Sequence, residues 1–216
     1  MIKYLMENMT EKNLIFDLDD TLIDTSSAIL RRIYELLDCY PVREGALYIY
    51  HLLAHSERES ILATRYDFSY EFWRDYEKLR KKFRNRPIGG KGIKNKLEQL
   101  SAQGIRMGLL TRAPNRKVIE FIRDSGVQIE FFQLGIYDSD NLRYKKPHPL
   151  CFHPILQKCG SENTFYCGDS LEDLRLARKS KINFIAVCTG LTNRETFIQA
   201  GVKNGMIFGN IFEVEL

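Results

Sequence analysis

Aspartates at two separate places along the chain have the type and spacing needed to hold a metal ion. Asp17 and Asp19 alternate in one acidic run, and Asp169 and Asp173 stand close together further along. Two carboxylates that share a site raise each other's pKa unless a cation lies between them. Oxygen ligands with no nearby histidine or thiolate favour Mg²⁺ over zinc. The sequence therefore predicts a Mg²⁺ site, although an acidic pair taken alone also serves as a helix cap or turn.

The segments around these aspartates predict strands and helices in alternation. The apolar run 13–16 ends at the first acidic group and is typical of a buried strand. Further strands are predicted at 105–110, 164–167 and 183–187, and helices at 93–100, 118–122, 151–159 and 171–179. Strands separated by helices pair in parallel, which predicts a doubly wound α/β fold. Ligands of such folds bind beyond the carboxyl ends of the strands, where Asp17, Thr111 and Asp169 stand.

A long stretch between the first and second strands has a different character. It has no comparable strand and instead shows apolar residues at helical spacing, at 28–37, 47–53, 61–62 and in a segment that ends near Phe83. A cluster of helix breakers, Arg86-Pro87-Ile88-Gly89-Gly90, follows it. We therefore expect an α/β core domain made of residues 1–23 and 88–216, with an all-helical domain, residues 24–87, inserted in it.

Four motifs in order resemble those of the haloacid dehalogenase-like hydrolase superfamily. They are Asp17-Leu18-Asp19-Asp20-Thr21-Leu22, Leu110-Thr111-Arg112, Lys146-Pro147 and Gly168-Asp169-Ser170-Leu171-Glu172-Asp173. The resemblance spans nearly the whole chain, and its first and fourth motifs are specific. The helical insertion is similar to the cap domain of the phosphoglycolate phosphatase and β-phosphoglucomutase-like subgroup. The resemblance thus implies a Rossmann-like core with a helical cap.

The resemblance also implies roles for the acidic residues. Asp17 would be the nucleophile that forms an aspartyl-phosphate, which divides one difficult displacement into two easier ones. Asp19 would protonate the leaving oxygen and then activate water. Mg²⁺ would be held by Asp17, the backbone carbonyl of Asp19, and Asp169, and Asp173 would support this shell.

Two further residues are expected to stabilise the transferring phosphoryl group. Negative charge spreads over three oxygens of that group, and the Thr111 hydroxyl and Lys146 ammonium are suitable donors. Lys146 is preferred to its neighbour Lys145 because the family pattern places the lysine directly before proline. Arg112 departs from the small or amide residue often found after the motif threonine.

These assignments predict a Mg²⁺-dependent phosphatase acting on small phosphomonoesters. Asp19 argues against a dehalogenase, since carbon–halogen cleavage leaves no oxygen to protonate. A phosphomutase of the β-phosphoglucomutase type is the alternative, and a noncatalytic phosphate-binding descendant is a less favoured one. A phosphate receiver domain is disfavoured by the order of the motifs. Specificity would depend on the cap, whose conceivable contacts are Arg31, Arg32, His51, His55, Arg58, Arg65 and Trp73, although a surface or packing role is favoured for each.

The composition agrees with a small phosphorylated metabolite as the partner. The 216 residues are 44% hydrophobic and 28% charged, which is typical of a globular protein, and the formal charge of +4 falls short of a nucleic-acid-binding pattern. Five cysteines without a CxxC pair predict a reducing, cytoplasmic environment. No signal peptide or membrane span is expected, and the protein is expected to be a monomer or homodimer.

Overall fold

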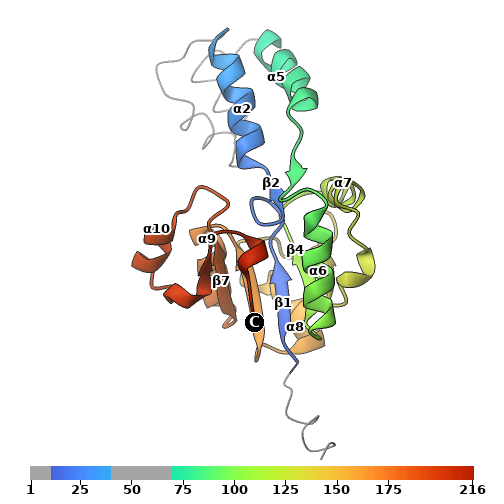
Figure 1. Cartoon of the computed structure of the whole chain (residues 1–216), viewed down its shortest axis with the longest axis vertical. Helices are drawn as coiled ribbons and strands as arrows, with labels where there is room; N and C mark the ends of the chain where they lie inside the picture. Colours follow the sequence, from blue (N-terminus) through green and yellow to red (C-terminus); the bar gives the residue numbers. More distant parts are fainter. Residues whose placement is uncertain (1–10, 40–69) are drawn as a thin grey trace, which may run out of the picture. The chain divides into compact units, whose positions relative to one another are not determined.

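The computed structural model of the protein describes residues 11–39 and 70–216 (Figure 1). Contacts divide the chain into two compact units, a core unit of Met1–Asp24 with Arg86–Leu216 and an inserted unit of Thr25–Asn85. The chain leaves and re-enters the core unit through a short antiparallel pair, β2 (Ile23–Asp24) with β3 (Arg86–Pro87). The breaker cluster after residue 85 therefore coincides with the return of the chain to the core unit.

The core unit contains one parallel sheet with the strand order β5-β4-β1-β6-β7-β8. Its strands are β1 (Asn13–Phe16), β4 (Arg106–Leu110), β5 (Gly135–Tyr137), β6 (Thr164–Gly168), β7 (Asn183–Val187) and β8 (Ile207–Phe208). The predicted doubly wound α/β class is confirmed. The two edge strands were not predicted, because three residues in β5 and two in β8 are too few to show a period.

Helices cover both faces of this sheet because the central strands are apolar on both sides. Leu14 and Phe16 pack in one buried cluster, and Ile15 packs in the other. Helices α6 (Gly92–Ala102) and α7 (Asn115–Ser125) contribute to the first cluster. Helices α8 (His153–Cys159), α9 (Leu171–Lys179) and α10 (Arg194–Gln199) contribute to the second. Short 3₁₀ turns complete the unit: η1 (Ile129–Phe131), η2 (Pro149–Phe152), η3 (Asn204–Met206) and η4 (Ile211–Glu213).

The segment predicted as one helix over 151–159 is divided in the structure. The 3₁₀ turn η2 runs to Phe152, and α8 begins only at His153. Pro154 lies in the first turn of α8. Because proline has no N–H to donate to the preceding turn, it is tolerated at a helix start and not in a helix interior.

The inserted unit contains two described helices, α2 (Ser26–Leu37) and α5 (Tyr70–Lys82), which pack against each other. Arg32 is buried, and its guanidinium donates to the Phe83 carbonyl and to Asn85 Oδ1, the latter at 2.8 Å. The basic side chains along α5 and just after it are exposed, which is typical of an amphipathic helix: Lys78, Arg80, Lys81, Lys82 and Arg84. The helical patterns predicted at 47–53 and 61–62 fall outside the described residues.

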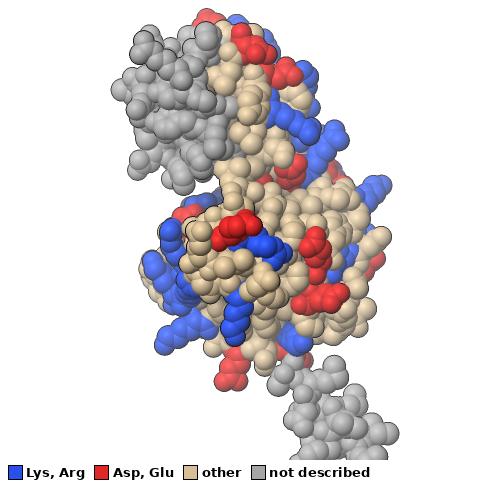
Figure 2. All heavy atoms as spheres, turned by 60° about the vertical axis from the view of Figure 1, so that its left-hand side comes forward, with Lys and Arg blue, Asp and Glu red and all other residues tan. Residues whose placement is uncertain are grey.

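Charged side chains of both signs are visible on the face drawn in Figure 2, in keeping with the small formal charge of +4. Helix α9 shows how apolar and charged side chains are separated: it buries Leu174 and Leu176 and exposes Arg175 and Arg178.

Among the residues that the structure describes, none of the helices has the length and apolar character needed to cross a membrane.

Candidate active site

The register of the sheet brings three polar residues to one edge. Phe16, the last residue of β1, pairs with Leu109 on one side and Cys167 on the other, so Asp17, Thr111 and Asp169 follow neighbouring strand ends. The backbone N–H of Asp17 continues this pairing by donating to the Cys167 carbonyl at 2.8 Å. Strand β1 is also where the strand order reverses, since β4 and β6 lie on its two sides. The candidate site therefore occupies the position where doubly wound folds bind ligands.

Three of the predicted acidic residues meet there. Single carboxylate oxygens of Asp17, Asp169 and Asp173 all lie within 4.8 Å of one another. Asp173 enters from α9, whose first turn is fixed by Ser170: the Ser170 hydroxyl donates to Asp173 Oδ2 at 2.5 Å and accepts from the Asp173 N–H at 3.2 Å. This capping orients the Asp173 carboxylate toward the strand ends.

The Asp19 side chain is placed differently. Its carboxylate forms an ion pair with Lys117 of α7 and is about one third exposed, at 35%. It is therefore not part of the three-carboxylate group. Lys117 was not identified from the sequence, because the 98 residues that separate it from Asp19 leave no local pattern.

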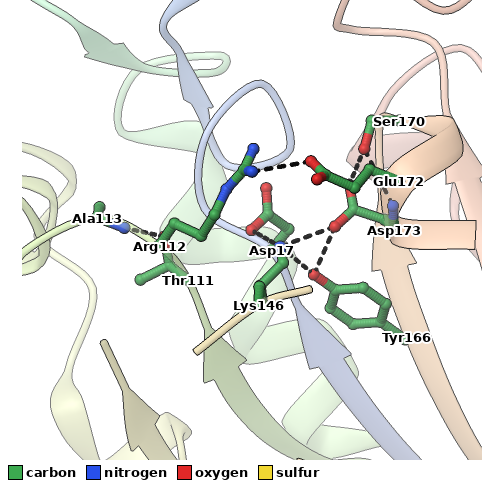
Figure 3. A network of polar contacts seen from close by, with 9 residues as sticks. All are labelled: Asp17, Thr111, Arg112, Ala113, Lys146, Tyr166, Ser170, Glu172 and Asp173. Carbon is green, nitrogen blue, oxygen red and sulfur yellow. Dashed lines mark hydrogen bonds and ion pairs between the residues drawn. The ribbon is translucent and has the colours of Figure 1, made fainter. Parts of the chain in front are cut away.

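Lys146 is the buried cation of the site (Figure 3). Its ammonium lies 2.7 Å from Asp17 Oδ1 and 2.7 Å from Asp173 Oδ1, and it donates to the Tyr166 hydroxyl at 2.5 Å. Lys145 is exposed, so the residue directly before Pro147 is the one that reaches the carboxylates. Its role in phosphoryl transfer stays a prediction.

Tyr166 of β6 is a site residue that the sequence reasoning missed. Its side chain is fully buried, and its hydroxyl accepts from Lys146 and donates to Asp173 Oδ1 at 2.8 Å (Figure 3). A buried tyrosine hydroxyl needs a partner, and Tyr166 stands two residues before the Gly168 that opens the last motif. Its place two residues before the last motif is the only feature of the sequence that could have suggested Tyr166 as a site residue.

The electrostatics differ among the three carboxylates. Burial, with the neighbouring charges of Asp173 and Asp19, raises the pKa of Asp17 to about 7 even though Lys146 opposes this. Burial and the charges of Asp173 and Asp17 also raise the pKa of Asp169 well above its usual range. Burial would raise the pKa of Asp173 as well, but Lys146 and the hydrogen bonds from Lys146, Ser170 and Tyr166 lower it.

These charges fit a divalent cation. The three carboxylates lie close together, and Lys146 pairs with two of them, so two negative charges of the group are unbalanced at full ionisation. The donors are all carboxylate oxygens, which suits Mg²⁺. Asp17, Asp169 and Asp173 are the residues that could hold it.

Two glycines make room for these carboxylates. A Cβ on Gly168 would lie 2.8 Å from the Asp173 carboxyl carbon, and a Cβ on Gly190 would overlap Asp169 Oδ2. Gly190 lies in the loop after β7, where the Thr189 hydroxyl also donates to the Asp20 carbonyl. The backbone of this loop therefore fixes where the Asp169 carboxylate can lie.

Thr111 and Arg112 follow β4 on the other side of Asp17 (Figure 3). Thr111 is buried, and its hydroxyl oxygen accepts from the Ala113 N–H at 3.0 Å, which leaves the hydroxyl proton available for donation. The Arg112 guanidinium lies 2.9 Å from Glu172 Oε2 of α9. Burial disfavours its charged form, but Glu172, Asp17 and Asp173 together raise the pKa of Arg112.

The residues suggested as cap contacts divide into three groups. Arg32 serves the packing of the inserted unit, and Trp73 contacts the rings of Phe72 and Tyr76 within α5. Arg31 is exposed on α2. The others lie outside the described residues: His51, His55, Arg58 and Arg65.

Comparisons with known proteins agree with this arrangement. The family model described as haloacid dehalogenase-like hydrolase matches residues 14–187. A phosphoglycolate phosphatase from Yersinia pestis is 26% identical over 84% of this chain and 81% of its own length. A pyrophosphatase, PpaX, from Bacillus pumilus is 25% identical over 78% of this chain and 79% of its own length.

The fold is also similar to solved structures. A candidate β-phosphoglucomutase from Thermotoga maritima superimposes with a TM-score of 0.70, at 19% identity, over 94% of this chain and 95% of its own. These matches support the predicted subgroup of phosphoglycolate phosphatases and β-phosphoglucomutase-like proteins. The chain belongs to the haloacid dehalogenase-like hydrolases, and it is an enzyme of that family.

Proposed function

We propose that the protein is a Mg²⁺-dependent phosphatase that hydrolyses small phosphomonoesters through an aspartyl-phosphate on Asp17. The observation that carries this proposal is the grouping of Asp17, Asp169 and Asp173 at the reversal point of the strand order, where Lys146 pairs with Asp17 and Asp173. The phosphatase names of the related proteins support it.

The first half of the reaction transfers the phosphoryl group to the enzyme. An ionised Asp17 oxygen attacks phosphorus, the bond from phosphorus to the ester oxygen breaks, and the Asp19 carboxyl gives its proton to the departing oxygen. Lys146 and the Thr111 hydroxyl donate hydrogen bonds to the phosphoryl oxygens as their charge develops. A bound Mg²⁺ would supply charge neutralisation for those oxygens and for the carboxylates.

The second half returns the enzyme to its starting state. The Asp19 carboxylate takes a proton from water, the water oxygen attacks the phosphorus of the aspartyl-phosphate, and phosphate departs as the Asp17 carboxylate is restored. In the structure the Asp19 carboxylate forms an ion pair with Lys117 of α7, and this half requires the ionised form of Asp19. The first half requires the carboxyl group to be protonated and turned toward the leaving oxygen.

The inserted unit is proposed to be a helical cap on the core, with residues 24–87 as the inserted domain and residues 1–23 and 88–216 as the catalytic domain. Closure of a cap excludes water and strengthens the electrostatic interactions in a site. All five cysteines are free thiols, which supports the proposal that the protein works in the reducing cytoplasm.

An assay of phosphate release from a panel of small esters tests the proposal. The panel includes phosphoglycolate, sugar phosphates, nucleotides and pyrophosphate, and each is assayed with Mg²⁺ and with EDTA. We expect turnover that is lost in EDTA and in Asp17→Asn, and that persists in Asp38→Asn, a matched change at an exposed aspartate. Unchanged turnover in Asp17→Asn, or no turnover of any ester by folded, Mg²⁺-loaded protein, would overturn the proposal.

A further inference from the structure

Arg112 is a partly exposed cation that lies beside the candidate site. It directly follows Thr111, and in Figure 3 its side chain extends above Asp17 toward Glu172. Its side chain is 51% exposed and that of Glu172 is 39% exposed, and their ion pair has a length of 2.9 Å. Among the residues that the structure describes, Glu172 is the only ion-pair partner of this guanidinium.

Lys146 and Arg112 differ in how firmly the structure holds their charged groups. Lys146 is 6% exposed and is held by Asp17, Asp173 and Tyr166, so it is fixed beside the reacting carboxylate. Within the described part of the chain Arg112 has one ion-pair partner, Glu172, and exposed pairs of this kind contribute little net stability. A guanidinium carries five N–H donors in a planar fork that matches a carboxylate or a phosphate. Arg112 can therefore exchange Glu172 for an anion at small cost.

We propose that Arg112 binds a second acidic group of the substrate, a carboxylate or a phosphate, next to the phosphoryl group that Asp17 attacks. The inference rests on the proposed phosphatase function and names its substrate class: small phosphate compounds with a neighbouring anionic group. Glu172 competes with that group for the guanidinium. With a substrate that lacks a second acid, Arg112 stays paired with Glu172 and contributes less to binding.

Matched substrates and variants test this assignment. Phosphoglycolate is compared with ethyl phosphate, which lacks the carboxylate, and pyrophosphate is compared with methyl phosphate. The measured quantity is the ratio of kcat/KM within each pair, which cancels effects common to both substrates. The phosphoglycolate pair tests the carboxylate and the pyrophosphate pair tests the second phosphate.

We expect wild type to prefer the doubly acidic member of at least one pair. Arg112→Gln lowers that ratio by about tenfold or more, mainly through KM, because charge-assisted hydrogen bonds are lost. Arg112→Lys keeps the positive charge but lacks the planar set of N–H donors, so we expect a ratio between those of wild type and Arg112→Gln. Glu172→Gln removes the competitor and raises the ratio, an effect that a purely structural ion pair would not produce.

Ratios that are the same in wild type, Arg112→Gln and Glu172→Gln would overturn this inference while ester hydrolysis itself continued. Loss of all Mg²⁺-dependent turnover in wild type would overturn the proposed function, and the inference with it. If Arg112→Gln fails to fold, as shown by its thermal unfolding, Glu172→Gln alone decides: a raised ratio supports the assignment, and an unchanged or lowered ratio contradicts it.

Discussion

Lys146 Nζ lies 2.7 Å from Asp17 Oδ1, and both side chains are less than a tenth exposed. The same ammonium lies 2.7 Å from Asp173 Oδ1. One buried cation thus holds two buried carboxylates that would otherwise repel each other. The proposed nucleophile is therefore fixed in place by a residue 129 positions away in the sequence.

Removing the Lys146 charge should destabilise the protein as well as inactivate it. Lys146→Met leaves Asp17 and Asp173 buried without their cation, and breaking a buried ion pair in this way costs about 3–5 kcal/mol. We expect a loss of this order in the free energy of unfolding, measured by urea denaturation at pH 8. Lys145→Met, at the exposed neighbour, should change it by less than about 0.5 kcal/mol. Equal losses in the two variants would contradict the assignment of Lys146.

Tyr166 should tune the carboxylate group without touching substrate. Tyr166→Phe removes only the hydroxyl that donates to Asp173 and accepts from Lys146. Loss of such a supporting hydrogen bond weakens metal binding by about 10- to 100-fold. Titration of Mg²⁺ into the purified variant measures this. Tyr137→Phe is the control, because that hydroxyl contacts the Pro154 carbonyl at 3.5 Å; a similar loss in both variants would argue against a specific role for Tyr166.

Gly190 should be required for the position of Asp169. The Cβ of Gly190→Ala would overlap Asp169 Oδ2, so the carboxylate must leave its position within the three-carboxylate group. We expect about 10-fold weaker Mg²⁺ binding or more, given the strict geometry of this ion. Gly205→Ala is matched to it, since a Cβ there meets nothing within 4 Å, and it should bind Mg²⁺ as wild type does. Wild-type affinity in Gly190→Ala would show that Asp169 is not a ligand.

Stability without metal should depend on pH through Asp17. The pKa of Asp17 is about 7 in the folded protein and 3.8 in the reference state, so the folded state binds more protons between these values. Folding stability therefore falls as pH rises through this window, by up to about 4 kcal/mol. Asp17→Asn lacks this loss, so in EDTA it should be more stable than wild type at pH 8 and similar to it at pH 4.5. Thermal unfolding at both values measures the difference, and a variant less stable at pH 8 would contradict the sign.

The sequence predicted the parts of the site that lie at strand ends. Asp17 and Asp169 follow strands that are recognisable from their apolar runs, and the position before Pro147 distinguished Lys146 from Lys145. The surroundings of the Asp19 carboxylate could not be predicted from the sequence. Alternation along the chain places it near Asp17, but its pairing with Lys117 depends on how α7 packs.

The remaining differences also arise from tertiary contacts. Tyr166 and Glu172 join the site through side chains that meet residues from other strands and loops, and no local spacing reveals such partners. Strand β8 has only two residues, and it is defined by its pairing with β7 and not by a pattern in its own sequence. Helix α8 begins two residues later than predicted because Pro154 requires a helix start.

The side chain that becomes phosphorylated during turnover identifies the nucleophile. Wild-type protein is mixed with Mg²⁺ and a hydrolysed ester, quenched in acid within the first turnover, digested and mapped by mass spectrometry. We expect one phosphoryl group on the peptide that contains Asp17, and none in Asp17→Asn treated in the same way. A phosphoryl group on any other side chain, or wild-type turnover by Asp17→Asn, would contradict it.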